Sequence, residues 1–120
     1  GDTVVVGAPG PGGMSGGSGY VFTREVAGSL TSGWGQRSKL LGDKLAEGNG
    51  PDSFGFGRST AIDGDTIVIG ASSEDLKSPY SGSAYVFTRD IASELKSGWT
   101  RLSKLFPADG AAGDQFGIDV

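Results

Sequence analysis

Short runs of β-branched and aromatic residues alternate along the chain with segments rich in glycine, serine and acidic residues. Runs such as Thr3–Val6 and Thr66–Ile69 are almost entirely apolar, which is typical of strands buried on both faces. Trp34–Leu41 mixes apolar and polar side chains, which indicates an outer strand with one solvated face. Val26–Thr31 and Ile91–Lys96 could each form one helical turn, but neither is long enough for a stable helix. The predicted strands are Thr3–Val6, Tyr20–Thr23, Trp34–Leu41, Arg58–Ile62, Thr66–Ile69, Tyr85–Thr88 and Trp99–Phe106.

The sequence contains two copies of one unit. GDTVVVGA at residues 1–8 returns as GDTIVIGA at residues 64–71, a shift of 63 positions, and YVFTR returns from Tyr20 to Tyr85 after 65 positions. SGW and SKL recur in the same order, and FGRST at Phe56 has a counterpart in FGIDV at the end of the chain. The small differences in spacing fall in segments predicted as loops, so we interpret the pattern as a structural repeat.

Each unit is predicted to hold four antiparallel strands, with Asp63-Gly64 as the two-residue hairpin turn between the first two. Four antiparallel strands at this period are typical of a β-propeller blade. Residues 1–53 then supply strands two to four of one blade plus a connector. Residues 54–106 form a complete four-stranded blade, and residues 107–120 form a connector and the first strand of the next blade. Two blades cannot close a ring. We therefore expect the chain to be part of a longer propeller, or several copies to assemble and share strands.

The Phe-Gly and Gly-Ala pairs of each unit resemble the FG-GAP repeat of the integrin α-subunit β-propeller and of many microbial surface proteins. Phe56-Gly57 precedes Gly70-Ala71, and Gly7-Ala8-Pro9 is the complete second half of the motif. The second unit departs from it, because Ser72 stands in place of the proline. The resemblance implies a seven-bladed propeller, usually extracellular, that serves adhesion or ligand binding.

Composition narrows the classes of function. The 120 residues include 23 glycines but no cysteine and no histidine, and the net charge is −4. A Ser-His-Asp triad, a disulfide framework and a zinc-thiolate site are therefore excluded within this chain. The acidic balance disfavours nucleic-acid binding, and no apolar run approaches the roughly 20 residues that span a bilayer. Carboxylate pairs could support glycoside hydrolysis, but the acidic residues recur in both units as structural residues do, so we expect no enzyme.

Two acidic loops are candidates for a calcium site. The resemblance implies that some blades bind Ca²⁺ between their first two strands, in a loop that is short here and holds only Asp63 and Asp65. Because Ca²⁺ takes about six to eight oxygen ligands, we interpret this loop as a hairpin whose carboxylates accept local backbone N–H groups, with a metal site as the alternative. Asp109 and Asp114 lie in the connector after the last predicted strand. They are either cation ligands or caps of a blade-to-blade connector.

The loop Ser72–Ser81 is the strongest candidate for partner contact. It joins the second and third strands of its blade, at a rim where propellers usually hold ligands. The alternative is a plain solvated loop, which is also the interpretation of its glycine-rich counterpart Gly10–Ser18. The side chains expected to contact a protein or a glycan are Ser73, Glu74, Asp75, Lys77 and Tyr80.

Trp34 and Trp99 stand at equivalent strand starts. Aromatic rings can stack on sugars, but repetition at matching positions favours structural packing. Arg24 and Arg89 end equivalent strands, and each is followed by an acid with which a surface ion pair would contribute little. We therefore expect a non-catalytic extracellular or cell-surface scaffold for adhesion or ligand binding. The alternatives are a carbohydrate-binding propeller lectin and a structural subunit of an extracellular assembly in which blade edges pair between copies.

Overall fold

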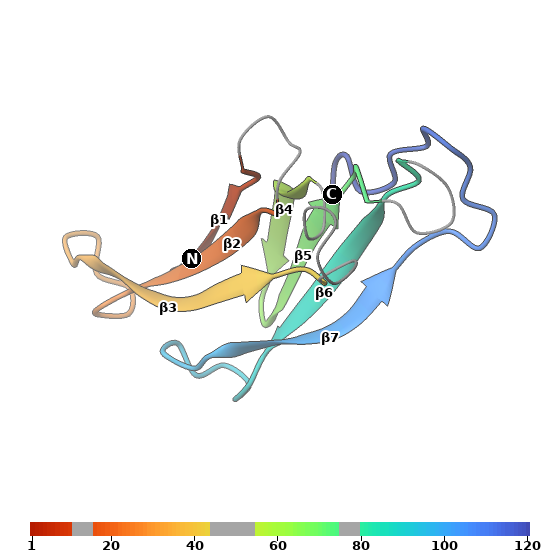
Figure 1. Ribbon diagram of the computed structural model, residues 1–120. Coiled ribbons are helices and arrows are strands. Elements are labelled where there is room, and N and C mark those ends of the chain that lie inside the picture. The colour runs from red at the N-terminus through yellow and green to blue at the C-terminus, as the bar shows by residue number, and fades with distance from the viewer. Residues whose placement is uncertain (11–15, 44–54, 75–79) are drawn as a thin grey trace.

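The computed structural model is all-β and describes residues 1–10, 16–43, 55–74 and 80–120, in which seven strands form two antiparallel sheets (Figure 1). The first sheet has the order β1-β2-β3 and the second has the order β4-β5-β6-β7. The described residues contain no helix, so none of them forms one that could cross a membrane. The strands are β1 (Thr3–Ala8), β2 (Ser18–Arg24), β3 (Trp34–Leu41), β4 (Phe56–Asp63), β5 (Thr66–Ala71), β6 (Ser83–Arg89) and β7 (Trp99–Leu105).

The seven strands listed from the sequence are all present, and several extend into neighbouring glycines, as β1 does into Gly7 and β5 into Gly70. The β4–β5 hairpin differs by one residue from the prediction. Asp63 pairs with Thr66, so the turn residues are Gly64 and Asp65 rather than Asp63 and Gly64. Gly64 takes the first of these positions because its φ of 54° is strained for any side chain. The segments after β2 and β6 form turns and not the single helical turns considered from the sequence. One of these turns is closed by a hydrogen bond from the Glu94 N–H to the Ile91 carbonyl (3.1 Å).

The two sheets are built to the same register. Gly7 pairs with Gly19 between β1 and β2, and Gly70 pairs with Ala84 between β5 and β6. Both sheets also carry a β-bulge at the same point of the third-strand pairing, after Val21 in the first sheet and after Val86 in the second. The repeat in the sequence is therefore a repeat in three dimensions.

The hydrophobic core lies between the sheets, where one face of the second sheet packs on the back of the first. Phe56 at the start of β4 is fully buried, and its ring meets Tyr85 and Phe87 edge-on, with ring centroids 5.2 and 6.2 Å apart. Such geometry is favourable for aromatic pairs. The buried residues of this layer are Val21, Leu40, Phe56, Ile67, Ile69, Ala71, Tyr85, Phe87 and Trp99.

Glycines allow the start of β4 to lie directly on the backbone of the first sheet. A Cβ atom at Gly7 would overlap the carbonyl oxygen of Gly57, and one at Gly17 would overlap the carbonyl oxygen of Phe56. The second sheet repeats this contact, because a Cβ at Gly70 would overlap the carbonyl oxygen of Gly117. We call this arrangement the glycine contact. It explains why Phe-Gly and Gly-Ala occur together in each unit.

Residues 116–120 are not a strand, although the sequence predicted one there. Phe116 makes an isolated bridge with Gly82, and its N–H donates to the Ser81 carbonyl (3.0 Å). A strand needs a sheet beyond it with which to pair, and the described residues offer none on that side. The segment therefore ends against the second sheet.

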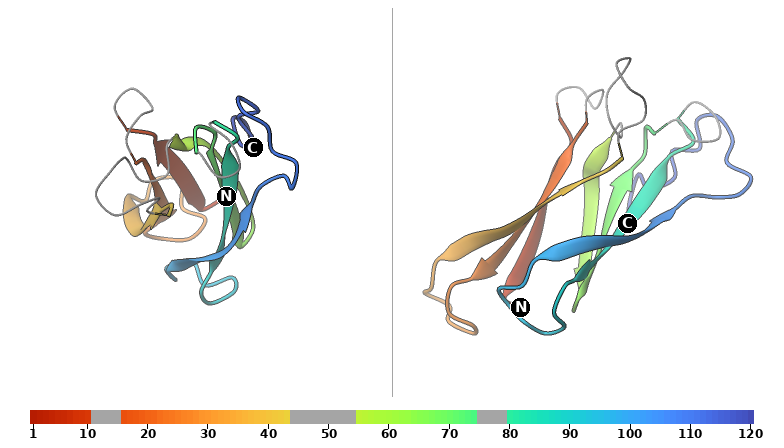
Figure 2. Two further views of the ribbon diagram at one scale, coloured as in Figure 1. Left: turned by 45° about the vertical axis from the view of Figure 1, so that its right-hand side comes forward. Right: turned by 60° about the horizontal axis from the view of Figure 1, so that its bottom comes forward.

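The loops gather at the two ends of the sheets. The right-hand view of Figure 2 places the N-terminus, the β4–β5 hairpin and the loops after β2 and β6 at one end. We call this end the lock rim, because it holds two repeated sets of arginine contacts that are defined below as locks. The connections after β1 and β5 leave from the opposite end.

Candidate functional site

The lock rim repeats one set of contacts in both sheets. The carboxylate of Asp65 pairs with Arg89 Nε at 2.7 Å and accepts the Ser93 N–H at 3.1 Å. The Arg89 guanidinium lies over the Trp99 ring, 4.6 Å from its centroid. Its Nη1 also donates to the Leu95 carbonyl at 3.2 Å. One arginine thus ties the β6–β7 loop to the hairpin and to the first residue of β7.

The first sheet has the same arrangement with Asp2, Arg24 and Trp34. Asp2 pairs with Arg24 Nε at 3.1 Å and accepts the Gly28 N–H at 3.0 Å, and the Arg24–Trp34 separation is again 4.6 Å. We call each set a lock. The sequence suggested that Arg24 and Arg89 pair with the acids that follow them, which is wrong. Hairpin register places Asp2 opposite Arg24, so the partner is across the strand pair rather than next along the chain.

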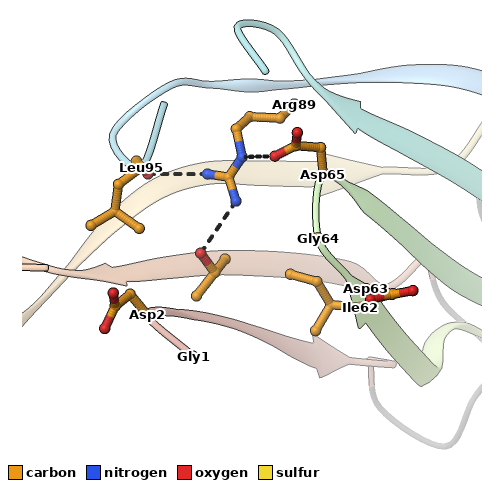
Figure 3. Close-up of a pocket in the computed structure, with 9 residues that line it drawn as sticks. Gly1, Asp2, Ile62, Asp63, Gly64, Asp65, Arg89 and Leu95 are labelled. Atoms are coloured by element: carbon orange, nitrogen blue, oxygen red, sulfur yellow. Dashed lines mark hydrogen bonds and ion pairs between the residues drawn. The ribbon is translucent and has the colours of Figure 1, made fainter. Parts of the chain in front are cut away.

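A cleft of about 380 Å³ opens between the two locks (Figure 3). Its floor is crossed by a hydrogen bond from Arg89 Nη2 of the second sheet to Thr3 Oγ1 of the first, at 3.3 Å. The cleft is open and mixed in polarity, and its carboxylates include those of both locks. The residues that line it are Gly1, Asp2, Thr3, Ile62, Asp63, Gly64, Asp65, Arg89 and Leu95.

The candidate calcium ligands lie in two separate segments, the β4–β5 hairpin and the connector after β7. Asp65 is engaged by its lock, whereas Asp63 is exposed on the other side of Gly64. Asp109 and Asp114 are both exposed, and the Asp114 carboxylate accepts the Ala111 N–H at 2.8 Å, as a capping residue would. Within the described part of the chain, no three acidic residues are grouped as metal ligands.

Because Asp65 belongs to a lock and Asp63 does not, we expect alanine substitutions at these two positions to lower the stability of the chain by different amounts. Asp65→Ala should lower the free energy of unfolding by about 1–2 kcal/mol, because Arg89 loses its carboxylate and Ser93 its acceptor while partial exposure softens both losses. Asp63→Ala, the matched control, should stay within about 0.5 kcal/mol of the parent. Urea denaturation without calcium measures both. Equal losses would show that the lock does not stabilise the rim.

At the opposite end, Glu74 holds the start of the candidate partner loop. Its side chain is fully buried, and it accepts hydrogen bonds from Ser83 Oγ and from the Tyr85 hydroxyl at 3.1 Å. Lys104 of β7 makes an ion pair with the same carboxylate. The backbone closes the loop, since the Gly82 N–H donates to the Glu74 carbonyl at 3.0 Å. Glu74 therefore anchors the loop from inside, and its burial corrects the expectation that it contacts a partner directly.

Of the other predicted partner residues, the structure describes Ser73 and Tyr80. Ser73 is half-buried next to the anchor. Tyr80 is exposed and has a φ of 55°, in the left-handed region. Asp75 and Lys77 lie outside the described residues.

Lys104 also connects the anchor to the first sheet. Its ammonium lies 3.2 Å from the Asp43 carboxylate, which Arg101 also contacts, and the Asp43 N–H donates to the Tyr85 hydroxyl at 3.1 Å. Partial burial acts to raise the pKa of Asp43, but the hydrogen bonds from Arg101 and Lys104 outweigh it and lower that pKa. For Lys104, burial acts to lower the pKa, but bonding to Glu74 and Tyr85 raises it overall.

These two shifts define a window of pH stability. Asp43 has a lower pKa in the folded chain than its ordinary value of 3.8. Its contribution is therefore complete above that value and is lost as the pH falls through the folded pKa. Lys104 has a raised pKa, so its contribution is complete below its ordinary value of 10.5 and is lost at more alkaline pH. Asp43→Asn should flatten the acid limb of a plot of unfolding free energy against pH and leave the alkaline limb in place. An unchanged acid limb would contradict this assignment.

β-Propellers are built from repeated four-stranded antiparallel sheets that pack face to face. The second sheet has all four strands of such a blade, and the first sheet has three. Family comparison agrees. Residues 34–87, just under half of the chain, match the model of the FG-GAP repeat. The match runs from β3 of the first sheet to β6 of the second, so the chain carries an FG-GAP repeat. The matched residues include Phe56-Gly57 and Gly70-Ala71, which each supply one side of a glycine contact. No curated protein and no solved structure gives a significant match.

Proposed function

We propose that this chain is a non-catalytic, extracellular or cell-surface propeller segment that serves as a scaffold for adhesion or ligand binding. FG-GAP repeats are typical of extracellular proteins, which supports the location. The observation that carries the proposal is the anchored loop at residues 72–81. Its base is fixed by the buried Glu74 and by the bond from Gly82 to Glu74. A loop with a fixed base loses less conformational entropy on binding a partner.

The proposed contact surface is the part of this loop that the anchor presents, with Tyr80 as its exposed aromatic residue. Tyrosine offers a large contact area at low entropic cost. Ser73, Asp75 and Lys77 are proposed to supply polar contacts. The partner is a protein or a glycan, since the loop combines an aromatic ring with charged and hydroxyl groups.

A loop exchange tests the proposal. Beads that carry the chain are assayed for adhesion to collagen, fibronectin and laminin coatings and on a glycan array. Replacing residues 75–80 by alternating glycine and serine should weaken binding by about tenfold or more, while Glu74 keeps the base in place. The matched control replaces residues 91–94 on the lock rim in the same way. Equal binding by both variants, or binding to none of these probes, would overturn the proposal.

The lectin alternative depends on an accessible tryptophan. Trp99 is unsuited, since it is only 7% exposed and Arg89 covers one face of its ring. Trp34 is 41% exposed, although Arg24 covers one face there too. If the chain is a lectin, Trp34→Ala should remove its signals on the glycan array. A signal retained by that variant argues against stacking at this position.

Calcium binding is proposed only as an addition to this function. The exposed Asp109 and Asp114 are the available carboxylates of the connector. Millimolar calcium should then raise the melting temperature of the parent chain but not that of the Asp109→Asn, Asp114→Asn variant. The absence of any shift in the parent would remove calcium from the proposal.

A further inference from the structure

The tip of the β4–β5 hairpin carries the peptide bond between Asp63 and Gly64, next to the lock of the second sheet, which we call the second lock. The Asp63 side chain is exposed, and no described residue forms a hydrogen bond or an ion pair with its carboxylate. Figure 3 shows this side chain directed away from Arg89. The carboxyl group is therefore available for reaction with its own backbone.

Gly64 leaves its own amide nitrogen unobstructed. Nothing lies within 4 Å of a Cβ built on Gly64, and its N–H donates no hydrogen bond to a described backbone carbonyl. A neighbouring sheet does not close such a tip. Gly1, the equivalent residue of the first sheet, has the β4–β5 hairpin beside it across the cleft, and its Cβ position is equally open. The Gly64 nitrogen therefore has access to the carboxyl carbon of the preceding aspartate.

We propose that Asp63-Gly64 is a site of spontaneous isoaspartate formation and that the second lock controls its rate. The Gly64 nitrogen attacks Cγ of Asp63, so an N–Cγ bond forms, the carboxyl C–OH bond breaks, and the hydroxyl leaves with the amide proton as water. Water then opens the succinimide ring at either carbonyl. Opening at the backbone carbonyl routes the chain through Cβ and Cγ, which lengthens the backbone by one carbon. The proposal does not depend on the ligand-binding function.

The other aspartyl-glycine bond of the described chain, Asp109-Gly110, is held differently. The Gly110 N–H donates to the Pro107 carbonyl at 3.3 Å. A Cβ built on Gly110 would meet Pro107 and Ser81 at 3.4 and 3.5 Å, so this turn is packed where Gly64 is open. The remaining described aspartates all precede a residue with a side chain, which hinders the attack. Asp63 should therefore react first.

The second lock restrains the motion that ring closure requires. The peptide plane after Asp63 is held by the pairing of Asp63 with Thr66, so the hairpin tip must open before the nitrogen reaches Cγ. Asp65 holds the other side of the tip, since it pairs with Arg89 Nε at 2.7 Å and accepts the Ser93 N–H at 3.1 Å. Breaking the lock should speed the reaction. Conversely, the added backbone carbon displaces Asp65 from its partners, so the reaction should open the lock.

Peptide mapping after weeks at mildly acidic pH and physiological temperature tests the site. Trypsin places the two aspartyl-glycine bonds in separate peptides, residues 59–77 and 105–120. Asn49-Gly50, which lies outside the described residues, falls in a third peptide. Electron-transfer fragmentation should then find isoaspartate at Asp63. Asp63→Glu should abolish this signal, because glutamate would have to close a larger and less favourable ring.

The first sheet supplies the matched control for the lock. Asp65→Ala breaks the second lock and should raise the rate of conversion at Asp63 by about threefold or more. Asp2→Ala breaks the equivalent lock and should leave that rate unchanged. In converted chains the Ser93 amide should exchange faster with solvent, whereas the Gly28 amide, which donates to Asp2, should not. Thermal unfolding confirms that each variant is folded.

The reference for reactivity is the chain unfolded in urea, which should isomerise at both aspartyl-glycine bonds. Absence of isoaspartate at Asp63 in the folded chain over the same period would overturn the proposal. Faster conversion at Asp109 than at Asp63 in the folded chain would overturn it as well. Equal rates in the Asp65→Ala and Asp2→Ala variants would show that general stability, rather than the second lock, controls the reaction, and the proposal would then be wrong.

Discussion

Gly7→Ala is expected to destabilise the chain by about 3 kcal/mol or more, at the upper end of the overpacking costs seen in protein cores. The added methyl group would overlap the carbonyl oxygen of Gly57, which is backbone and cannot rotate away. Relief requires the start of β4 to move off β1, and Phe56 at the centre of the core would move with it. The midpoint of urea denaturation measures the loss.

A matched control separates this close approach from the general effect of losing a glycine. Nothing lies within 4 Å of a Cβ built on Gly33, in the exposed loop before β3. Gly33→Ala should therefore change the free energy of unfolding by no more than about 0.5 kcal/mol. If Gly7→Ala is as mild as Gly33→Ala, the contact between the two backbones does not hold the sheets together.

Lys104→Met is expected to cost about 3–5 kcal/mol, the usual result of removing one partner from a buried ion pair. Glu74 is fully buried, and the donors that the described residues would still offer its carboxylate without the ammonium are the hydroxyls of Ser83 and Tyr85. Adding Glu74→Gln should recover part of the loss, because the amide is neutral and its oxygen still accepts from those hydroxyls. Denaturation of the parent, both single variants and the double variant gives the coupling energy.

The repeat supplies the control for this experiment. Lys39 is the equivalent residue of the first sheet, and it lies 5.7 Å from the Tyr20 ring centroid as Lys104 lies 5.0 Å from that of Tyr85. Lys39 is exposed. Lys39→Met should therefore cost no more than about 0.5 kcal/mol. Equal costs for the two lysines would mean that the cation over the tyrosine ring, rather than the buried carboxylate, determines stability.

The strands could be predicted because their signal is local. Alternation, β-branched residues and the doubled motifs placed all seven strands, and Trp34–Leu41 matches β3 at both ends. The hairpin was misplaced by one residue because Asp63-Gly64 and Gly64-Asp65 both contain a glycine suited to a tight turn. Only the pairing of Asp63 with Thr66 distinguishes them.

The site could not be predicted as well, because burial depends on neighbours that are distant in sequence. Glu74 lies in a polar stretch that indicates exposure, yet Lys104, 30 residues away, and the Tyr85 hydroxyl place it inside. Trp34 and Trp99 both follow Ser-Gly at the start of equivalent strands, and they differ in exposure because a sheet covers only the second. The ion-pair partners of Arg24 and Arg89 could have been predicted from the sequence, because the repeated motifs indicate which residues of the paired strands lie opposite each other.

The uneven cover on the two sheets implies a gradient of local opening along the chain. β5 and β6 lie in the middle of their sheet with buried neighbours on both sides, whereas β1 is an edge strand with an exposed valine on alternate residues. Amide hydrogens of β1 should exchange with solvent well before those of β5, through partial unfolding that leaves the second sheet intact. Exchange monitored by NMR would then divide one 120-residue chain into an inner, slow half and an outer, fast half.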